Sequence, residues 1–502
     1  MNTSNTLPLI EHASEHGGRR AVSDASGTYS YETLLEKSKS VASALLAQNG
    51  TDLSEKNVAF LVPSSFEYVA VQWGIWRAGG VAVPLAVSHP TSELEYVLED
   101  ADPEVVIAHE SLAPKIESAV AARNIRFLLT DEVLNHAEGL LPDVAPRRRA
   151  LIIYTSGTTG HPKGAVTTHA NIEAQALALI EAWGWTREDD ILCVLPLHHV
   201  HGIVNILTCA LRSGAHCTMV EHFDADGVWE FFRAKQPTLF MAVPTIYRRL
   251  IKAFEEASAE RQREFAEASK HLRLMVSGSA ALGVQTLERW REITGHTLLE
   301  RYGMTELGMV LSNPLEGERM PGRVGQPLPG VEVQLQDERG APVAEGEQGE
   351  ICVRGPNVFL EYWKRPDETE KAFRNGWFLT GDIAVVENSN YRIVGRNSVD
   401  IIKTGGYKIS ALEVEEVLRS HEFIEECAVV GVPDADWGER VSVAAEVSAG
   451  ETLTLDELKE WASSRLAPYK IPRSLKVLDS LPRNAMGKVT KPQVVKLFQE
   501  TV

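Results

Sequence analysis

The 502-residue sequence predicts an α/β protein in which a large N-terminal domain, residues 1–396, precedes a smaller α+β domain, residues 397–502. From Val58 onward, short apolar runs alternate with amphipathic stretches, which is typical of mostly parallel sheets covered by helices. Near residue 396 this alternation ends and a shorter mixture of strand and helix patterns begins. With 44% hydrophobic and 24% charged residues, the chain can bury a large core without disulfides or structural metals.

The predicted strands follow one another at regular intervals. Residues 58–63 are predicted to form a buried strand, and Ser64 and Glu67 are expected to form a capping box that begins a helix ending at Gly79-Gly80. Because ligands in such folds bind at the carboxyl ends of strands, we expect the polar clusters behind the strands to form the functional site. The remaining strands are expected at residues 81–85, 151–155, 191–196, 238–244, 272–279 and 297–303.

Charge and cysteine content narrow the possible partners. Fifty basic and 69 acidic residues give a net charge of −19, which argues against a general grip on nucleic acid or an anionic membrane. The five cysteines form no C-x-x-C pair and are expected to be buried, reduced thiols. Residues 191–211 contain no charged side chain, but their proline, glycine and three histidines favour a buried strand, loop and helix over a membrane span.

The N-terminal segment carries acidic Glu11 and Glu15 and no apolar run, so it predicts neither a signal peptide nor a transit peptide. The C-terminal residues Glu-Thr-Val are not a peroxisomal signal. We therefore expect a cytoplasmic protein without membrane insertion. Its expected partners are small-molecule substrates and no nucleic acid, and its expected state is a monomer or a weak homodimer.

The strongest local motif is TSGTTGHPKG, residues 155–164, directly behind a predicted strand. Its glycines bring backbone N–H groups close to an anion, and its hydroxyls and Lys163 supply further donors. This composition favours a polyphosphate ligand, although the spacing is not that of a Walker A loop. The alternative is a surface loop rich in Gly, Ser and Thr.

Three weaker motifs each have an ordinary structural alternative. Residues 302–306, YGMTE, could stack a base, bind a phosphate and ligate Mg²⁺. Residues 377–382, WFLTGD, end in an aspartate that could accept two ribose hydroxyls or could simply form a turn. Residues 481–488, LPRNAMGK, place Lys488 on a loop, where a lysine is usually a solvated charge.

Together these motifs resemble the adenylate-forming superfamily of acyl-CoA synthetases, peptide-synthetase adenylation domains and luciferases. The resemblance covers nearly the whole chain, in order, and also includes PLHHVHG (196–202), GEICVRGP (349–356) and GRNSVDIIKTGG (395–406). It implies the adenylate-forming fold with a mobile C-terminal domain, and a reaction in two steps. A carboxylate attacks the α-phosphate of ATP to give acyl-AMP and pyrophosphate, and the thiol of CoA then displaces AMP. Mg²⁺ is the implied cofactor, and ATP and CoA are the co-substrates.

The resemblance also implies residue roles. Lys488 would bridge the carboxylate and the α-phosphate, Thr158 and Glu306 would hold the metal, and His199 has a gate-like position. The implied catalytic residues are Lys488, Glu306, Thr305 and His199, and the implied ATP-binding residues are Thr155, Ser156, Gly157, Thr158, Thr159, Gly160, Lys163, Tyr302, Thr305, Asp382, Arg396 and Lys488. Gly405, Gly406 and Lys408 would serve the CoA step, and the hinge position, usually Asp or Lys, is Ser398 here.

Four polar residues distinguish the expected acyl pocket: His201, Arg249, Ser279 and Arg301. A buried arginine without a partner is very costly, so a pocket lined by two arginines should hold an anion. A short dicarboxylate offers a second carboxylate for bidentate recognition, whereas a fatty acid offers only the one that reacts. The segments VPTIYRRL, MVSGSAAL and LLERYGMTE resemble malonyl-CoA synthetases, including a form that also takes methylmalonate, and this resemblance implies that the four residues bind the distal carboxylate.

Other readings of these residues remain open. Arg248 or Arg249 could be solvated, Arg301 could pair with Glu300, and the histidines at 198, 199 and 201 favour a hydrogen-bonded set over a zinc site. The alternative functions are a ligase for a short monocarboxylate, an adenylation enzyme that loads a carrier protein, and a catalytically silent nucleotide-binding protein.

Overall fold

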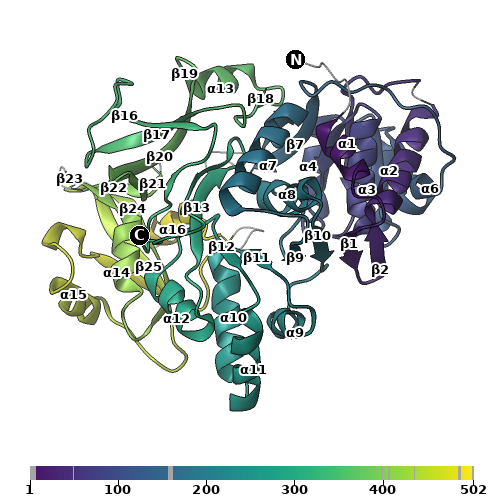
Figure 1. Cartoon of the computed structure of the whole chain (residues 1–502). Helices are drawn as coiled ribbons and strands as arrows, with labels where there is room; N and C mark the ends of the chain where they lie inside the picture. The colour runs from purple at the N-terminus through teal and green to yellow at the C-terminus, as the bar shows by residue number, and fades with distance from the viewer. Residues whose placement is uncertain are drawn as a thin grey trace.

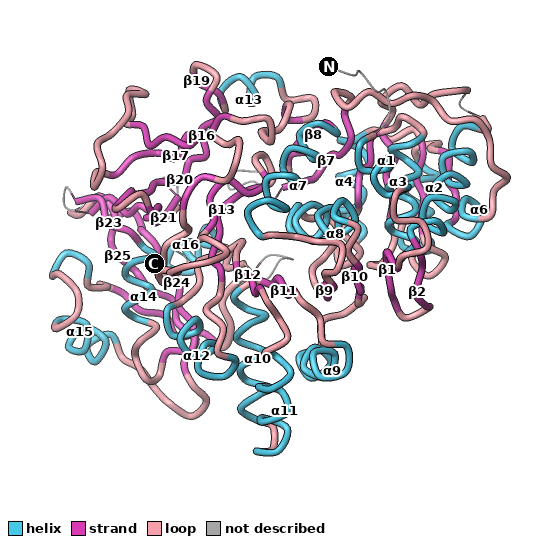
Figure 2. The backbone as a smooth tube through the Cα atoms, viewed as in Figure 1, coloured by secondary structure: helices cyan, strands magenta, loops and turns pink. Residues whose placement is uncertain are grey.

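The computed structural model describes residues 7–48, 50–155, 162–396, 399–404, 407–434, 436–483 and 488–499, apart from the side chain of Lys408. In Figure 1 the purple-to-teal part of the chain builds the larger body, and the light green and yellow C-terminal residues pack against one side of it. Figure 2 shows helices both at the outside of the larger body and in its middle, where strands lie on either side of them.

A seven-stranded sheet lies in the N-terminal part, in the order β18-β8-β7-β4-β3-β5-β6. The strands from β7 to β6 run parallel, while β8 and β18 run antiparallel to their neighbours. The strand bounds are β3 Asn57–Leu61, β4 Val81–Pro84, β5 Val105–Ala108, β6 Arg126–Leu129, β7 Arg149–Thr155, β8 Lys163–Thr168 and β18 Glu361–Tyr362.

A nine-stranded sheet has the order β15-β14-β13-β12-β11-β9-β10-β1-β2 and is parallel from β13 to β1. The carboxyl ends of its central strands therefore lie at one edge, as predicted. The bounds are β1 Arg20–Asp24, β2 Gly27–Ser30, β9 Asp190–Cys193, β10 His216–Met219, β11 Leu239–Ala242, β12 Leu274–Ser277, β13 Leu299–Met304, β14 Gly308–Ser312 and β15 Gln326–Pro327.

Two mostly antiparallel sheets complete the strands. One contains β16 Glu332–Gln336, β17 Gln348–Arg354, β19 Phe373–Arg374, β20 Trp377–Glu387 and β21 Asn390–Arg396. The other lies in the C-terminal part and contains β22 Ile401–Thr404, β23 Tyr407–Ser410, β24 Ile424–Asp434, β25 Gly438–Val447 and β26 Ser474–Leu478. The domain boundary predicted between residues 396 and 397 borders on residues outside the described ranges and stays a prediction.

Helices cover the sheets. In the first half of the chain these are α1 Pro8–Ser14, α2 Tyr31–Leu46, α3 Phe66–Arg77, α4 Thr91–Ala101, η1 Ala113–Lys115, α5 Glu117–Ala122, α6 Thr130–Leu134, α7 His169–Trp183, the π-helix η2 His201–Thr208, α8 Cys209–Ser213 and α9 Ala225–Lys235. The second half contains α10 Pro244–Glu256, α11 Ala259–Ser269, α12 Val284–Thr294, α13 Pro366–Lys371, α14 Ala411–Leu418, α15 Leu455–Ser463, η3 Pro468–Lys470 and α16 Lys491–Gln499.

The local predictions hold with one correction. Each predicted strand is present, but the capping box at Ser64 and Glu67 is wrong, because the N-cap of α3 is Ser65, whose Oγ accepts from the Tyr68 N–H. Asp24 on β1 accepts from the Phe66 N–H at 2.8 Å, so a contact distant in sequence fixes where the helix starts. Gly79 ends the helix with φ +77°, as predicted.

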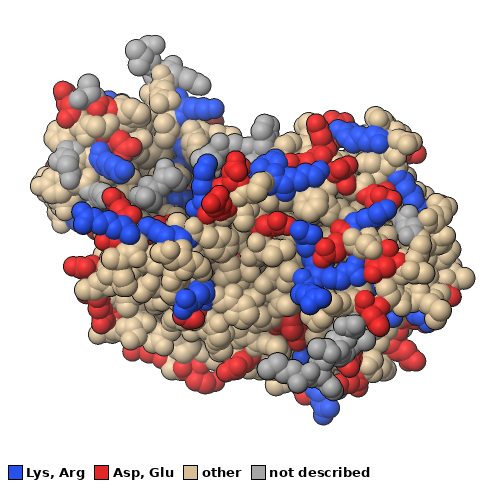
Figure 3. Space-filling model, turned by 90° about the horizontal axis from the view of Figure 1, so that it is seen from above, with Lys and Arg blue, Asp and Glu red and all other residues tan. Residues whose placement is uncertain are grey.

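The apolar stretch at residues 191–211 folds as β9, a loop, η2 and the start of α8. Within the described ranges, no helix is both long and apolar enough to cross a bilayer. The five cysteines are buried free thiols, as the sequence predicts. On the face shown in Figure 3, Lys and Arg side chains lie intermixed with Asp and Glu.

Two helices of the larger body, α10 and α12, contact the C-terminal part. Arg248 on α10 pairs with Glu426 on β24 at 2.6 Å, and the Val284 N–H at the start of α12 donates to Glu416 on α14 at 3.1 Å. The Arg248 and Arg419 cations beside Glu426 hold the pKa of its carboxyl below the usual range, although burial opposes them.

Candidate active site

The predicted nucleoside-binding residues lie together at the junction of two sheets. Asp382 on β20 accepts from the Tyr302 hydroxyl through Oδ2 at 2.5 Å and from Arg396 Nε through Oδ1 at 3.0 Å. The strand register places Asp382 opposite Arg396, while Tyr302 comes from β13 of the nine-stranded sheet. Three motifs far apart in the sequence thus form one cluster. The alternative that Asp382 only forms a local turn does not explain why it contacts residues from two other motifs.

The predicted phosphate-binding residues lie at the ends of β7 and β8. The Thr155 hydroxyl donates to the Lys163 carbonyl at 3.4 Å, and the Lys163 ammonium pairs with Glu368 on α13. The same ammonium lies 5.4 Å from the centre of the Tyr362 ring. Ser156, Gly157, Thr158, Thr159 and Gly160 lie outside the described residues.

Glu306 lies in the turn between β13 and β14, next to Thr305, and is only 5% exposed. Burial raises the pKa of its carboxyl, and the Tyr362 hydroxyl donates to Oε1 at 2.7 Å. A buried carboxylate whose charged form is disfavoured gains stability from a nearby cation. The oxygen donor and its burial therefore suit a hard divalent metal such as Mg²⁺.

Lys488 lies between the nucleoside cluster and the acyl pocket. Burial and the charges of Arg301 and Arg396 lower its pKa to about 8, whereas Asp382 acts in the opposite direction. The side chain as a whole is exposed, and the two nearby cations disfavour its ammonium form while the single carboxylate favours it.

The predicted acyl-binding residues gather around Arg301 on β13, which is 4% exposed. Its Nη2 donates to the Ser279 hydroxyl at 3.5 Å, and Ser279 Oγ lies 3.3 Å from His201 Nδ1 on η2. Burial lowers the pKa of Arg301 to about 9. Within the described part of the chain, no carboxylate forms an ion pair with Arg301, and its buried Nε has no hydrogen-bond partner.

His201 completes this cluster as a neutral ring. Burial, Arg301 and Lys488 together hold its pKa well below the usual value. Since Ser279 Oγ accepts from Arg301, its hydroxyl proton can point to His201 Nδ1, which leaves the proton of the neutral ring on Nε2. His201 Nε2 is buried and has no partner among the described residues, so it is a spare donor beside the arginine.

Two of the alternative interpretations, pairing of Arg301 with Glu300 and solvation of Arg248, are not found in the structure. Glu300 points away from Arg301, as neighbours on a strand do, and its Oε1 accepts from the Gly322 N–H at 3.0 Å. Arg248 is not solvated alone, because it pairs with Glu426.

Arg249 lies apart from the Arg301 cluster. It is exposed on α10, and its guanidinium lies 4.5 Å from the centre of the Phe223 ring. Among the described residues it makes no hydrogen bond or ion pair, so its role in binding stays a prediction.

The histidines at positions 198 and 199, just before η2, form a half-buried aromatic set with His89. The His198 and His199 ring centres are 4.1 Å apart, and His89 lies 5.6 Å from His198. Burial lowers the pKa of His199 to about 4, and the charge of Lys488 contributes to this shift. His199 is therefore a neutral ring near Lys488.

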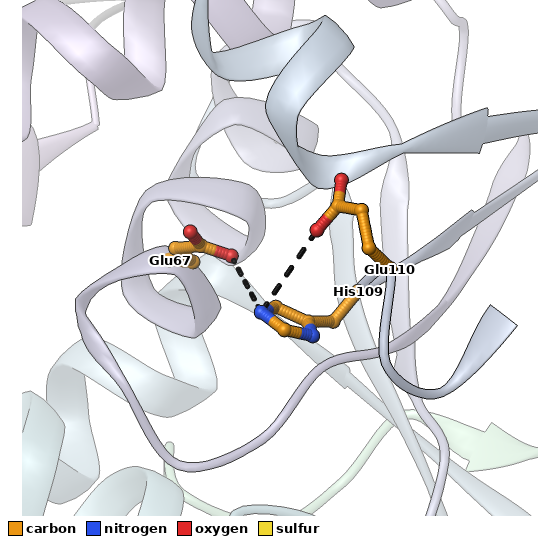
Figure 4. Close-up of side chains that lie close together, drawn as sticks. All are labelled: Glu67, His109 and Glu110. Atoms are coloured by element: carbon orange, nitrogen blue, oxygen red, sulfur yellow. Dashed lines mark ion pairs between the residues drawn. The ribbon is translucent and has the colours of Figure 1, made fainter.

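One group within the described ranges has ligand atoms close enough to suggest a metal: Glu67, His109 and Glu110, drawn in Figure 4. His109 Nε2 lies 3.7 Å from Glu67 and 3.9 Å from Glu110. However, Glu110 caps α6 by accepting from Thr130 and Asp131, and the Ser111 N–H donates to His109 Nδ1. Since His109 Nδ1 accepts, Nε2 is the ring nitrogen that can donate toward the carboxylates, so these contacts explain the group as a structural cap.

The remaining predicted residues are not tested by the contacts. Ser398, Gly405 and Gly406 lie outside the described residues, and only the backbone of Lys408 is described, opposite Lys403. Conversely, Tyr362 and Glu368 were not predicted as site residues, although they contact Glu306 and Lys163 respectively. A single tyrosine and a single glutamate on a charged helix carry no recognisable signal by themselves.

Two models of known protein families match this chain. A model described as AMP-binding enzyme matches residues 9–363, and one described as AMP-binding enzyme C-terminal domain matches residues 413–488. The chain belongs to the AMP-binding enzyme family. The predicted adenylate-forming fold, with a large N-terminal and a smaller C-terminal domain, is thereby confirmed, as is the prediction of an enzyme.

Several relatives of this AMP-binding enzyme are malonate–CoA ligases. It is 44% identical to the mitochondrial malonate–CoA ligase of Mus musculus, over 99% of this chain and 91% of that protein. It is 40% identical to the malonate–CoA ligase of Arabidopsis thaliana, over 98% of this chain and 88% of that protein. Among solved structures, ATP-bound MatB from Rhodopseudomonas palustris matches with a TM-score of 0.91 and 33% identity, covering 99% of both chains.

Proposed function

We propose that this protein is an ATP-dependent malonate–CoA ligase that converts malonate, ATP and CoA to malonyl-CoA, AMP and diphosphate through a malonyl-adenylate. One observation carries the proposal: Arg301 is a buried guanidinium without a carboxylate partner in the described structure. Its relatives support the same substrate, since several are named malonate–CoA ligases.

The energetic argument concerns the second carboxylate. A buried charge without a partner costs on the order of several kcal/mol, and a bound anion removes much of this penalty. Acetate or propionate would use its only carboxylate in the reaction and leave Arg301 unpaired. Malonate can react through one carboxylate while the other meets Arg301, Ser279 and the spare Nε2 donor of His201. Methylmalonate presents the same two carboxylates.

In this proposal the nucleotide lies between the two sheets. Tyr302 contacts the adenine, Asp382 and Arg396 exchange their mutual contact for the ribose, and Thr155 and Lys163 hold the phosphates. Residues 156–160 and Thr305 supply the other phosphate contacts. The ion pair of Lys163 with Glu368 keeps the ammonium at the loop until a phosphate replaces the carboxylate.

Mg²⁺ is proposed on Glu306 and Thr158, where it would offset phosphate charge. Tyr362 fixes the orientation of the Glu306 carboxylate, and burial keeps competing water away from it.

Lys488 is proposed as the catalytic residue of the first step. Its ammonium would bring together the malonate carboxylate and the α-phosphate, two anions that otherwise repel. The neutral ring of His199 is proposed as the gate beside it. For the second step, the C-terminal domain would turn about Ser398 and bring Gly405, Gly406 and Lys408 to the thiol.

The test is AMP release with Mg²⁺-ATP and CoA across acetate, propionate, malonate, methylmalonate and succinate. We expect malonate or methylmalonate to give the highest kcat/KM. A higher value for acetate or propionate would contradict the dicarboxylate proposal, and adenylation without consumption of CoA would indicate a carrier-loading enzyme. No AMP with any acid would indicate a silent nucleotide-binding protein.

The cytoplasmic location and the monomer or weak homodimer remain proposals. The names of several relatives include the word mitochondrial, which does not fit a plain cytoplasmic assignment. Imaging of the full-length tagged chain in its own cells would test the location, and light scattering would test the oligomeric state.

A further inference from the structure

We propose that Gly278 is the positioning residue for Arg301: its missing side chain makes the space in which the guanidinium lies. This inference rests on the proposed function, because it assigns the acid specificity of that site to a second residue. Gly278 directly follows β12, one residue before Ser279, and the three atoms nearest to a Cβ built on it all belong to Arg301.

The close approach is the first observation. A Cβ built on Gly278 would lie 2.5 Å from Arg301 Cζ and 2.6 Å from both Nε and Nη1. Ordinary non-bonded carbon contacts are about 3.5–4.0 Å, so a methyl group and the guanidinium cannot occupy these positions together. The flat guanidinium therefore lies directly against the backbone of Gly278.

The backbone conformation is the second observation, and it separates two reasons for a glycine. Gly278 is not among the residues with a left-handed φ, whereas Ser279, the next residue, has φ +69°. An L-residue could adopt the backbone conformation of Gly278 without strain, so the turn itself does not require glycine there. Glycine is required because the Arg301 guanidinium occupies the space that a side chain would need.

The pocket gives this contact a functional consequence. Arg301 is buried, so a methyl group at position 278 would have to move the guanidinium away from Ser279, whose hydroxyl it contacts. A displacement of about 1 Å in a positioning group can cost up to about a hundredfold in rate, because a bidentate contact requires both nitrogens in place. The atoms that must move end a flexible side chain, so the fold should tolerate the change.

The experiment compares AMP release by wild type, Gly278→Ala, Arg301→Ala and the double variant, with Gly283→Ala as control. A Cβ at Gly283 would meet its nearest atoms at 3.9 Å, and φ there is −64°, so that methyl group should fit. We expect Gly278→Ala to raise the KM for malonate about tenfold or more while the KM for ATP stays within about twofold. Gly283→Ala should change neither.

The double variant decides whether Gly278 acts through Arg301. Once Arg301→Ala has removed the guanidinium, adding Gly278→Ala should raise the malonate KM no further. An equal rise in both backgrounds, or an unchanged malonate KM in Gly278→Ala, would overturn the inference. If Gly278→Ala does not fold, a folded double variant supports competition for one space, and an unfolded double variant overturns it.

The wild-type acid panel keeps this test separate from that of the function. A wild type that prefers a monocarboxylate refutes the proposed function whatever the variants do. A wild type that prefers malonate, with a Gly278→Ala variant that keeps the same malonate KM, refutes only the role of Gly278.

Discussion

Arg301 Nη2 donates a hydrogen bond to the Ser279 hydroxyl at 3.5 Å, and the backbone of Ser279 lies in the left-handed region, with φ +69°. A non-glycine residue in this region costs on the order of 1–2 kcal/mol, and it persists where the surrounding structure holds it. The strained turn aims the hydroxyl at both Arg301 and His201. Strain, burial and a cation with no carboxylate partner among the described residues therefore occur at one place, which is the expected acyl pocket.

Two variants separate the hydroxyl of Ser279 from its backbone strain. Ser279→Ala and Ser279→Gly both remove the hydroxyl, so each should raise the malonate KM about tenfold, the equivalent of one hydrogen bond to a charged group. Only Ser279→Gly relieves the left-handed strain, so it should be more stable than Ser279→Ala by about 1 kcal/mol. Thermal unfolding and steady-state kinetics measure the two effects. Equal stability of the two variants would show that φ +69° carries no strain here.

Removing the buried cation should stabilise the ligand-free protein. Because burial lowers the pKa of Arg301 to about 9, well below its usual value, the native state disfavours the charged form, and this penalty is present in full below about pH 9. Arg301→Met keeps the volume and removes the charge, so we expect the melting temperature at pH 7 to rise and the malonate KM to rise about a hundredfold. A lower melting temperature with an equal rise in both KM values would show that Arg301 is structural.

The first step should lose rate as Lys488 loses its proton. Burial, Arg301 and Arg396 lower the pKa of Lys488 to about 8, so the free enzyme carries the ammonium below that pH and the neutral amine above it. We expect kcat/KM for malonyl-adenylate formation to fall as pH rises through about 8. Lys488→Ala should abolish adenylation, yet largely spare thioester formation from supplied malonyl-adenylate. Equal loss in both half-reactions would refute the assignment.

Glu368 should compete with the phosphates for Lys163. The two side chains form an ion pair, so ATP must displace the carboxylate before the ammonium can bind a phosphate. Glu368→Gln should therefore lower the KM for ATP a few-fold and leave the malonate KM unchanged. Glu370→Gln on the same helix is the control, since Glu370 is exposed. A rise in the ATP KM would mean that Glu368 positions the lysine instead of competing for it.

Much of the site could be predicted because its motifs are local in sequence. The Asp382, Tyr302 and Arg396 cluster was expected from three motifs, and the structure joins them within 3.0 Å. The predicted N-cap of α3 was one residue too early. The Phe66 N–H donates to Asp24 on β1, and this contact selects Ser65 as the N-cap. Tyr362 and Glu368 were missed for the same reason, since both act through contacts made across separate strands and helices.

The sequence by itself determined the family and the order of strands, since apolar periodicity and motif spacing are properties of neighbouring residues. It also named Arg301 as a candidate residue for binding the acid substrate. Only the tertiary structure decided that Arg301 lies away from Glu300, rests against Gly278 and has no carboxylate partner among the described residues. These facts depend on how β12, β13 and η2 pack together. Packing between segments that are distant in the chain cannot be predicted from the sequence of any one segment.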